Sequence, residues 1–125
     1  MPQLPHSVEL HDSKLAAIRP SSHGVMLELR PSYVHRDGKG WRQDADIEVI
    51  GANYIGITAP LPVRISDGEL KTSQGPYHNL LMLPLVVHGS ISLSLKLESG
   101  ELVELQGSGI TLHMHGEPVY VEQFQ

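Results

Sequence analysis

The sequence predicts an all-β protein, a single-domain antiparallel β-sandwich or flattened barrel of about seven to nine short strands spanning residues 1–125. Three observations support this class. Apolar and polar residues alternate with a period of two over residues 90–97, the pattern of a strand with one buried face. Nine prolines and twelve glycines recur at short intervals, which suits short strands separated by turns. Finally, no segment has a pattern that supports a helix longer than two turns.

The clearest element is a hairpin over residues 90–115. In its first arm, odd-numbered positions 91–97 are isoleucine or leucine, and the even-numbered ones are serine or lysine. Glu98–Glu101 provides the turn, since Gly100 readily takes the positive φ that a tight reversal needs. In the second arm, the apolar residues move from odd to even numbers across Gly107–Gly109. We therefore expect a bulge or corner at these glycines, which keeps both halves on one core.

The N-terminal third of the chain predicts another hairpin. Residues 12–19 begin with good helix N-cap residues, but Pro20 and the Ser-Ser-His-Gly turn after it favour a first β-arm. Gly24–His35 is the second arm, with odd-numbered positions 25–29 facing inward. Pro31 interrupts this arm and predicts an edge strand or a bend. Residues 36–40 are polar and glycine-rich, as in a loop tip.

A long strand is expected over Trp41–Ile57. Between Asp46 and Ile57 it carries apolar residues on both faces. A strand of this kind is either central in a sandwich or part of a subunit contact. The sequence therefore indicates self-association, with a homodimer as the simplest form.

The second half of the chain predicts shorter elements. The Asp-Gly pair indicates a turn at Ser66–Glu69, and Leu85–His88 reads as a short strand. Tyr77–Leu83 lies between two prolines and is either a single helical turn or an extended crossing. The tail over residues 116–125 is expected to be extended. Three apolar residues are expected to fix it: Val119, Val121 and Phe124.

Composition excludes several function classes. The formal net charge is −5, and the nine lysines and arginines form no cluster, which argues against binding to nucleic acid. No apolar run approaches the roughly 18 residues of a membrane-spanning helix. Residues 1–12 lack the basic and apolar regions of a secretory signal, and cysteine is absent, as is common in a reducing compartment. We therefore expect a cytoplasmic protein without a membrane or nucleic-acid partner.

The sharpest chemical pattern is His113-Met114-His115. On a strand, residues i and i+2 share a face, so both imidazoles could hold one metal ion. With Gly107 upstream, the segment resembles the first half of a cupin metal motif. In cupins a glutamate follows the second histidine after three or four residues, whereas here Glu117 comes too early and Glu122 too late. The alternative is that both histidines lie on the wet face of a strand.

Two further residue pairs have the residue types of reactive sites. A carboxylate can orient an imidazole, which suggests acid–base chemistry for His11-Asp12. Adjacent residues on a strand face opposite ways, however, so we expect a turn in which Asp12 caps backbone N–H groups. Asp44 and Asp46 share a strand face and would suit a cation, but a solvated pair is the plainer interpretation.

An aromatic group suggests a different kind of site. Trp41 beside Arg42, with Tyr33 and Tyr54, has the composition of a sugar or peptide groove. The alternative is that Trp41 packs over the end of the sheet.

A likeness spans three blocks of the sequence: Leu10–Leu15, residues 34–45 and Gly116–Phe124. Taken together, these blocks resemble a family of small bacterial proteins without an assigned activity. The opening His-Asp-Ser-x-Leu is also similar to the start of some immunity proteins of bacterial toxin systems, which implies a protein that neutralises a partner by binding it. The first resemblance implies no functional residues.

Together these patterns predict a non-enzymatic binding or assembly module, including immunity-like protein binding, with no catalytic residues and no cofactor. The sequence has no cysteine nucleophile, no Gly-x-Ser-x-Gly elbow and no phosphate-binding glycine loop with lysine. Glu98, Glu101 and Glu104 would suit a basic protein partner. Two alternatives remain: a metal-dependent, cupin-like enzyme using His113 and His115, and a carbohydrate-binding module using Trp41.

Overall fold

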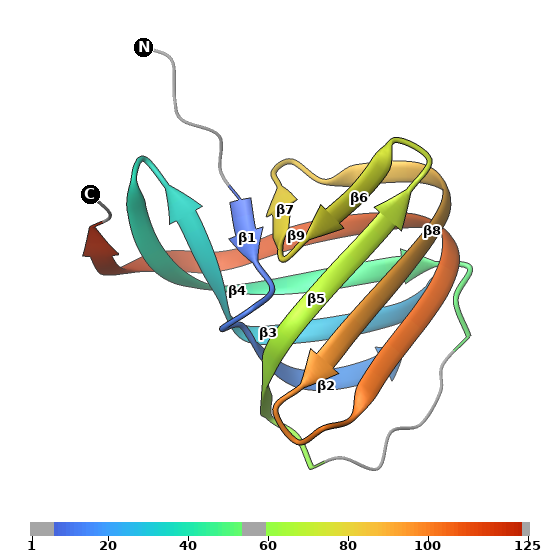
Figure 1. Ribbon diagram of the computed structural model, residues 1–125, viewed down its shortest axis with the longest axis horizontal. Helices are drawn as coiled ribbons and strands as arrows, with labels where there is room; N and C mark the ends of the chain where they lie inside the picture. Colours follow the sequence, from blue (N-terminus) through green and yellow to red (C-terminus); the bar gives the residue numbers. More distant parts are fainter. Residues whose placement is uncertain (1–6, 54–59, 124–125) are drawn as a thin grey trace.

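The computed structural model describes residues 7–53 and 60–123, and it confirms the all-β prediction with nine strands and no helix among these residues (Figure 1). No helix in this part of the chain is long and apolar enough to cross a membrane. The strands are β1 Ser7–Glu9, β2 Lys14–Pro20, β3 Gly24–Arg36, β4 Lys39–Ile50, β5 Val63–Thr72, β6 Gly75–His78, β7 Leu80–Met82, β8 Val86–Leu97 and β9 Leu102–Gln123.

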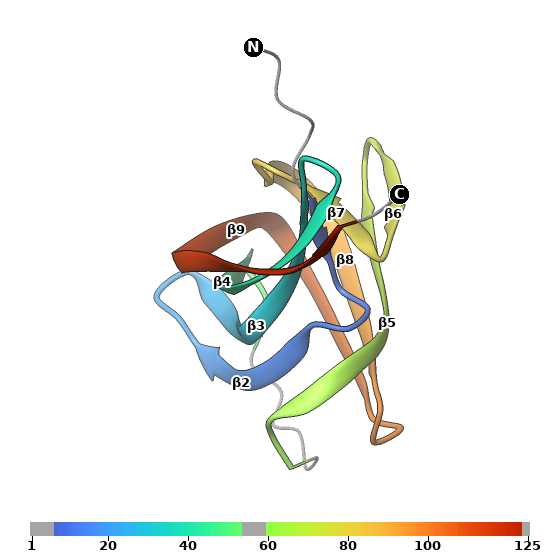
Figure 2. The ribbon, with the colours of Figure 1, turned by 90° about the vertical axis from the view of Figure 1, so that its left-hand side faces the viewer.

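The strands join one antiparallel sheet that closes on itself. Neighbouring strands follow the order β2-β5-β8-β9-β4-β3, and β2 also pairs with β3, so these six strands form a ring. β1 and then β7 extend the sheet beyond β3, and β6 adds to β5. The ring is a flattened barrel, as the two perpendicular views show (Figures 1 and 2).

β9 belongs to both sides of this barrel because it turns a corner at its glycines. Its first half pairs with β8, and its second half, from Gly109 onward, pairs with β4. At Gly107 a Cβ atom would lie 2.3 Å from the carbonyl oxygen of Ile50, so only glycine permits this close approach. The predicted corner is therefore confirmed, and Val103 and Ile110 on its two sides are both buried.

The core is aliphatic and lies inside the ring. The inward positions predicted on β3 and in the 90–97 arm are all buried, as are the apolar residues of β4 that face them. The fully buried large side chains include Leu10, Leu27, Leu29, Ile47, Ile65, Leu93 and Leu95.

The hairpin predicted from residues 12–35 is present as β2 and β3. Ser21 closes its turn by donating its amide to the Gly24 carbonyl, while its hydroxyl accepts the Gly24 amide. Pro31 lies in a bend and not in an edge strand, because the β3–β4 register shifts between Leu29 and Ser32 and β3 has neighbours on both sides. The bend lets one side of β3 pair first with β2 and then with β1.

The turn predicted at Ser66–Glu69 is wrong. β5 continues through this segment, with a register shift against β8 between Ile65 and Asp67, and the turn lies later, between Thr72 and Gly75. Gly68 serves packing instead of reversal, since a Cβ atom there would lie 2.6 Å from Cδ1 of Leu10. The other ambiguous segment, Tyr77–Leu83, is extended over β6 and β7.

The long strand predicted over Trp41–Ile57 ends early, at Ile50. Gly51 follows with a φ of 78°, which breaks the strand, and residues 54–57 lie outside the described residues. Ile47 and Val49 face the core in an ordinary one-sided strand. The two-faced strand that suggested self-association is therefore absent from the described part.

The tail is extended, as predicted, but Val119 does not fix it. β9 continues to Gln123 beside β4, and Val119 is 62% exposed. Val121 is half-buried, and Phe124 lies outside the described residues.

Candidate functional site

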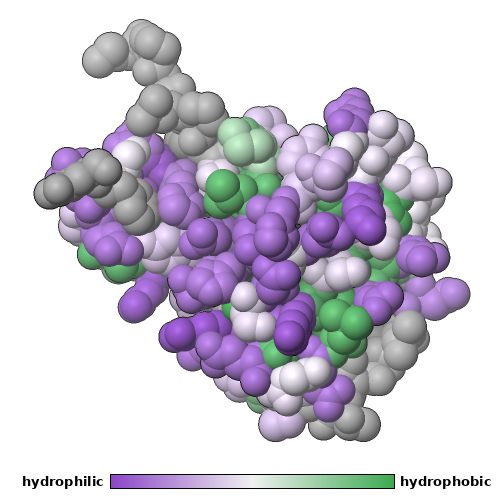
Figure 3. All heavy atoms as spheres, viewed as in Figure 1, coloured by the Kyte–Doolittle hydropathy of each residue, from purple (hydrophilic) through white to green (hydrophobic). Residues whose placement is uncertain are grey.

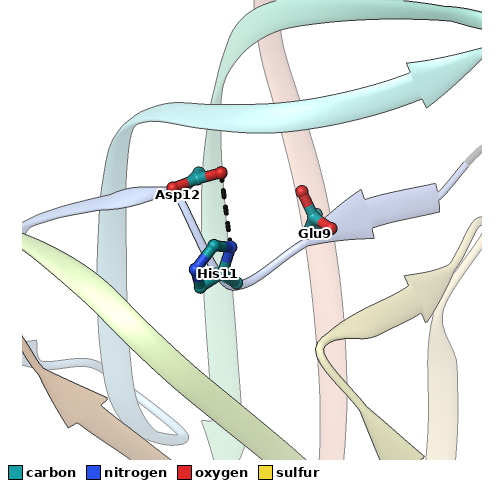
Figure 4. A group of neighbouring side chains, drawn as sticks. All are labelled: Glu9, His11 and Asp12. Atoms are coloured by element: carbon teal, nitrogen blue, oxygen red, sulfur yellow. Dashed lines mark ion pairs between the residues drawn. The ribbon is translucent and has the colours of Figure 1, made fainter. Parts of the chain in front are cut away.

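Among the described residues, one group of three metal-ligating side chains lies at the turn between β1 and β2. Glu9 ends β1, and His11 and Asp12 follow in the turn. One donor atom from each lies within 4.8 Å of the other two (Figure 4). The Nδ1 of His11 is 3.3 Å from the Oδ2 of Asp12. We call this group the turn cluster.

The backbone of the turn is held by β5 on one side and by the bend between β6 and β7 on the other. The amide of Leu10 donates to the carbonyl of Asn79 at 2.6 Å, and the amide of Asp12 donates to the carbonyl of Ile65 at 3.1 Å. Asp12 has a φ of 75°, a left-handed conformation that aspartate tolerates better than most residues. Because the chain reverses here, His11 and Asp12 do pair, contrary to the expectation based on a straight strand.

Charges of both signs surround the turn cluster, since Asp12 lines a cleft with Lys14, Arg42 and Arg64, while further carboxylates lie on the side of Tyr33. The Oε2 of Glu9 lies 3.6 Å from the Nε2 of His35, and the nearby Tyr33 hydroxyl donates to the Oε1 of Glu122 at 2.5 Å. Burial raises the pKa of Tyr33 well above its usual value, and so do the Glu122 hydrogen bond and the negative charges of Glu122, Glu9 and Asp12. Three carboxylates therefore act on the same small region.

A second charged group lies on the outer face of the barrel and links three strands. Asp46 on β4 is only 8% exposed, and its Oδ1 accepts from the guanidinium of Arg30 on β3 at 3.0 Å. Its Oδ2 lies 2.6 Å from the Nε2 of His115 on β9. Arg30 also donates to the carbonyl of Ala45 at 3.0 Å. The prediction of a solvated aspartate pair is thus wrong for Asp46 and right for the exposed Asp44, whose carboxylate is 3.9 Å from Arg30.

His113 and His115 share the exposed face of β9, opposite Asp46 and Asp44 in the strand register. His115 is engaged by Asp46. Within the described residues, neither histidine belongs to a group of three donor atoms that lie within 4.8 Å of one another. Because Arg30 shares the same carboxylate, the chemistry of this group is that of a cross-link between strands.

A cleft of about 280 Å³ lies beside this cross-link, where the β4–β9 register shifts between Arg42 and Asp44. Its walls include Asp44, His115 and Val119. Bulges often lie next to binding sites, because they redirect side chains. Here the bulge over residues 116–118 separates the regular part of β9 from its tail.

Trp41 packs at the end of the sheet, in line with the alternative to a sugar groove. It is partly buried against the core, its Nε1 lies 3.3 Å from the carbonyl of Arg36, and its ring meets Tyr120 edge-on at 5.5 Å. Of the other two aromatic residues of the predicted groove, Tyr33 donates its hydroxyl to Glu122, and Tyr54 lies outside the described residues.

The tail of β9 has an open edge. In the described part of the chain, β8 pairs with β9 only as far as Thr111, and β4 alone continues beside it to Gln123. Val119 and Tyr120 are 62% and 52% exposed on this tail. We call residues 119–123 the β9 edge.

The three glutamates predicted to suit a basic partner lie around the β8–β9 turn. Glu98, Glu101 and Glu104 are all exposed. Glu98 lies 3.8 Å from Arg64, and Lys96 is exposed on the same hairpin, so this surface is only partly acidic.

Sequence reasoning did not single out Glu9 or Arg30. Glu9 stands two residues before His11, a spacing that was available as a signal, but the buried Leu10 between them looked like part of a plain strand. Arg30 reaches Asp46 through a strand register that no local pattern contains.

The fold and these sites define a small all-β barrel protein with an acidic turn cluster and an open strand edge. No protein-family model, no curated protein and no solved structure matches the chain.

Proposed function

We propose that this protein is a non-enzymatic binding module that holds an extended segment of a partner protein along the β9 edge. The observation that carries this proposal is that, among the described residues, one side of residues 119–123 pairs with no strand, while Val119 and Tyr120 in this stretch are exposed. An open strand edge presents a row of backbone donors and acceptors that another extended chain can pair with.

The length of this edge suits a short peptide segment. Pro118 has no N–H group and lies in the bulge that precedes the edge, so pairing stops there. The remaining five residues, Val119–Gln123, match an ordinary strand length. A partner strand would extend the sheet at β9, on the side opposite β4.

Side chains at the edge supply anchors on both faces. Val119 and Tyr120 are neighbours on a strand and therefore point to opposite faces. Tyr120 contacts Trp41 edge-on, and exposed aromatic residues are frequent energetic centres of protein interfaces. Figure 3 shows that hydrophilic side chains dominate the face viewed there and that apolar patches are small and separate.

Charge favours a basic partner segment. The chain has a formal net charge of −5, and the charged residues of the tail itself are Glu117 and Glu122. Arg42 and Lys39 lie on β4, one strand back from the edge. Complementary charge on the partner would speed association and fix its direction.

The test compares two lysine substitutions at similarly exposed apolar positions. Val119→Lys places a charge at the β9 edge, and Leu102→Lys places one at the β8–β9 turn, where the leucine is 54% exposed. Affinity capture from the source cells should recover a partner with wild type and Leu102→Lys, and lose it with Val119→Lys. Loss with Leu102→Lys alone would assign binding to the glutamates of that turn and contradict the proposal.

Self-association is a separate outcome of the same test. Light scattering could show a dimer of the wild type that is lost in Val119→Lys. In that case a second copy of the chain occupies the β9 edge, and the proposal of a basic partner segment is contradicted.

A further inference from the structure

We propose that Glu9, His11 and Asp12 form a binding site for a divalent transition-metal ion, for which Zn²⁺ is the natural probe. The site is distinct from the β9 edge and from the His113/His115 pair. It offers two carboxylates and one imidazole from four consecutive residues.

The donor atoms are already close enough to share one ion. Zn–N and Zn–O bonds are about 2.0–2.2 Å long, so two ligands on opposite sides of one ion are separated by about 4 Å. The donor atoms of the turn cluster lie within 4.8 Å of one another, and His11 and Asp12 are 3.3 Å apart. Small side-chain rotations are sufficient to bring all three donors to bonding distance.

The turn is held in place without the ion. Leu10, between two of the ligands, is fully buried, and its amide donates to Asn79. The amide of Asp12 donates to Ile65, and the Ser13 hydroxyl donates to the carbonyl of Glu9 at 2.6 Å. A backbone fixed in this way lowers the entropy lost when a ligand binds.

On the side of Tyr33 the surroundings favour a cation, whereas Lys14, Arg42 and Arg64 line the cleft on the other side of Asp12. Glu9, Asp12 and Glu122 all act on Tyr33, and their mutual repulsion would be relieved by a bound positive charge. His35 lies 3.6 Å from Glu9, where it can orient that carboxylate or add a fourth donor. Mixed imidazole and carboxylate ligands suit Zn²⁺ and similar ions, whereas Ca²⁺ prefers oxygen ligands alone.

The test is calorimetric titration of untagged protein with zinc chloride, and with calcium chloride for comparison. We expect one zinc ion per chain, with binding that weakens in acid because protons compete with zinc for the ligand atoms. His11→Ala should weaken zinc binding by roughly tenfold or more, and Asp12→Asn should also weaken it. Calcium should bind far more weakly than zinc.

His78→Ala is the matched control. His78 is an exposed histidine that lies 2.8 Å from the carboxylate of Asp67, so it repeats the His–Asp pairing without Glu9. The His78→Ala substitution should leave zinc binding unchanged. Melting temperatures without metal should show that every variant is folded, because His11, Asp12 and His78 are exposed. The proposal is overturned if zinc does not bind, if His11→Ala binds zinc like wild type, or if only a His113→Ala and His115→Ala double variant loses the ion.

Discussion

His115 and Asp46 come from strands β9 and β4 and meet at 2.6 Å, with the aspartate almost wholly buried. The second oxygen of the same carboxylate binds Arg30 on β3. One side chain thus fastens three neighbouring strands on the outer face of the barrel, beside the bulge that leads into the β9 edge.

Replacing this carboxylate should destabilise the fold. Asp46→Ala leaves Arg30 without its closest charged partner, and we expect a loss of about 2–3 kcal/mol in the free energy of unfolding. Asp44→Ala, in the exposed aspartate 3.9 Å from Arg30, should cost about 0.5 kcal/mol or less. Urea unfolding measures both values. Equal losses in the two variants would show that the buried bridge is not what ties these strands.

The corner of β9 predicts a graded response to alanine. At Gly107 a Cβ atom would lie 2.3 Å from the backbone oxygen of Ile50, whereas at Gly109 the nearest atom, the Val87 oxygen, is at 3.0 Å. We expect Gly107→Ala to cost about 3 kcal/mol and Gly109→Ala about 1 kcal/mol, as measured by thermal unfolding. The reverse order would mean that the corner is wrongly placed.

Asp67 should make stability depend on pH in acid. The Asn79 side-chain amide, and secondarily His78, lower the pKa of Asp67 below its usual value. The ionised form is therefore favoured in the folded state, so its contribution is present above the unfolded-state pKa of about 3.9 and is lost as the pH falls through the folded pKa. The gap in melting temperature between wild type and Asp67→Ala should shrink between about pH 7 and pH 3.

Ser73→Ala is the control for this measurement, since it changes an exposed side chain that does not titrate. Its gap to wild type should stay constant over the same pH range. If the difference in melting temperature between wild type and Asp67→Ala is also constant, the Asp67 carboxylate is not the cause of the pH dependence.

Tyr33 should resist ionisation because of its burial and Glu122. Its pKa is raised, and Glu122→Gln removes the negative charge that its hydroxyl meets. We expect the pKa of Tyr33 in this variant to fall toward the ordinary value of about 10. Ultraviolet titration of tyrosinate, with Tyr33→Phe to assign the signal, measures the change. Glu117→Gln should leave the curve as in wild type.

Local patterns predict the parts of this fold that depend on neighbours in sequence. The alternation over residues 90–97 and the change of parity at Gly107–Gly109 correctly indicate a hairpin and its corner. The turn predicted at Asp67-Gly68 is wrong. The glycine is needed because the side chain of Leu10, from a distant segment of the chain, packs where a Cβ atom of residue 68 would lie.

The candidate sites depend even more on long-range contacts. His-Asp at 11–12 is visible in the sequence, but its pairing requires the left-handed turn at Asp12 and the hydrogen bonds that fix it. The Asp46–His115 contact spans 69 residues, and the Arg30 contact depends on the β3–β4 register. No spacing rule links these residues before the strands are paired.

Hydrogen–deuterium exchange tests the binding role of the β9 edge most directly. In the free protein, amides over residues 119–123 should exchange faster than those of β4 and β8, which have strands on both sides. Adding the captured partner should slow exchange at residues 119–123 and leave the β8–β9 turn unchanged. Protection confined to that turn, or no protection of residues 119–123, would contradict strand pairing at this edge.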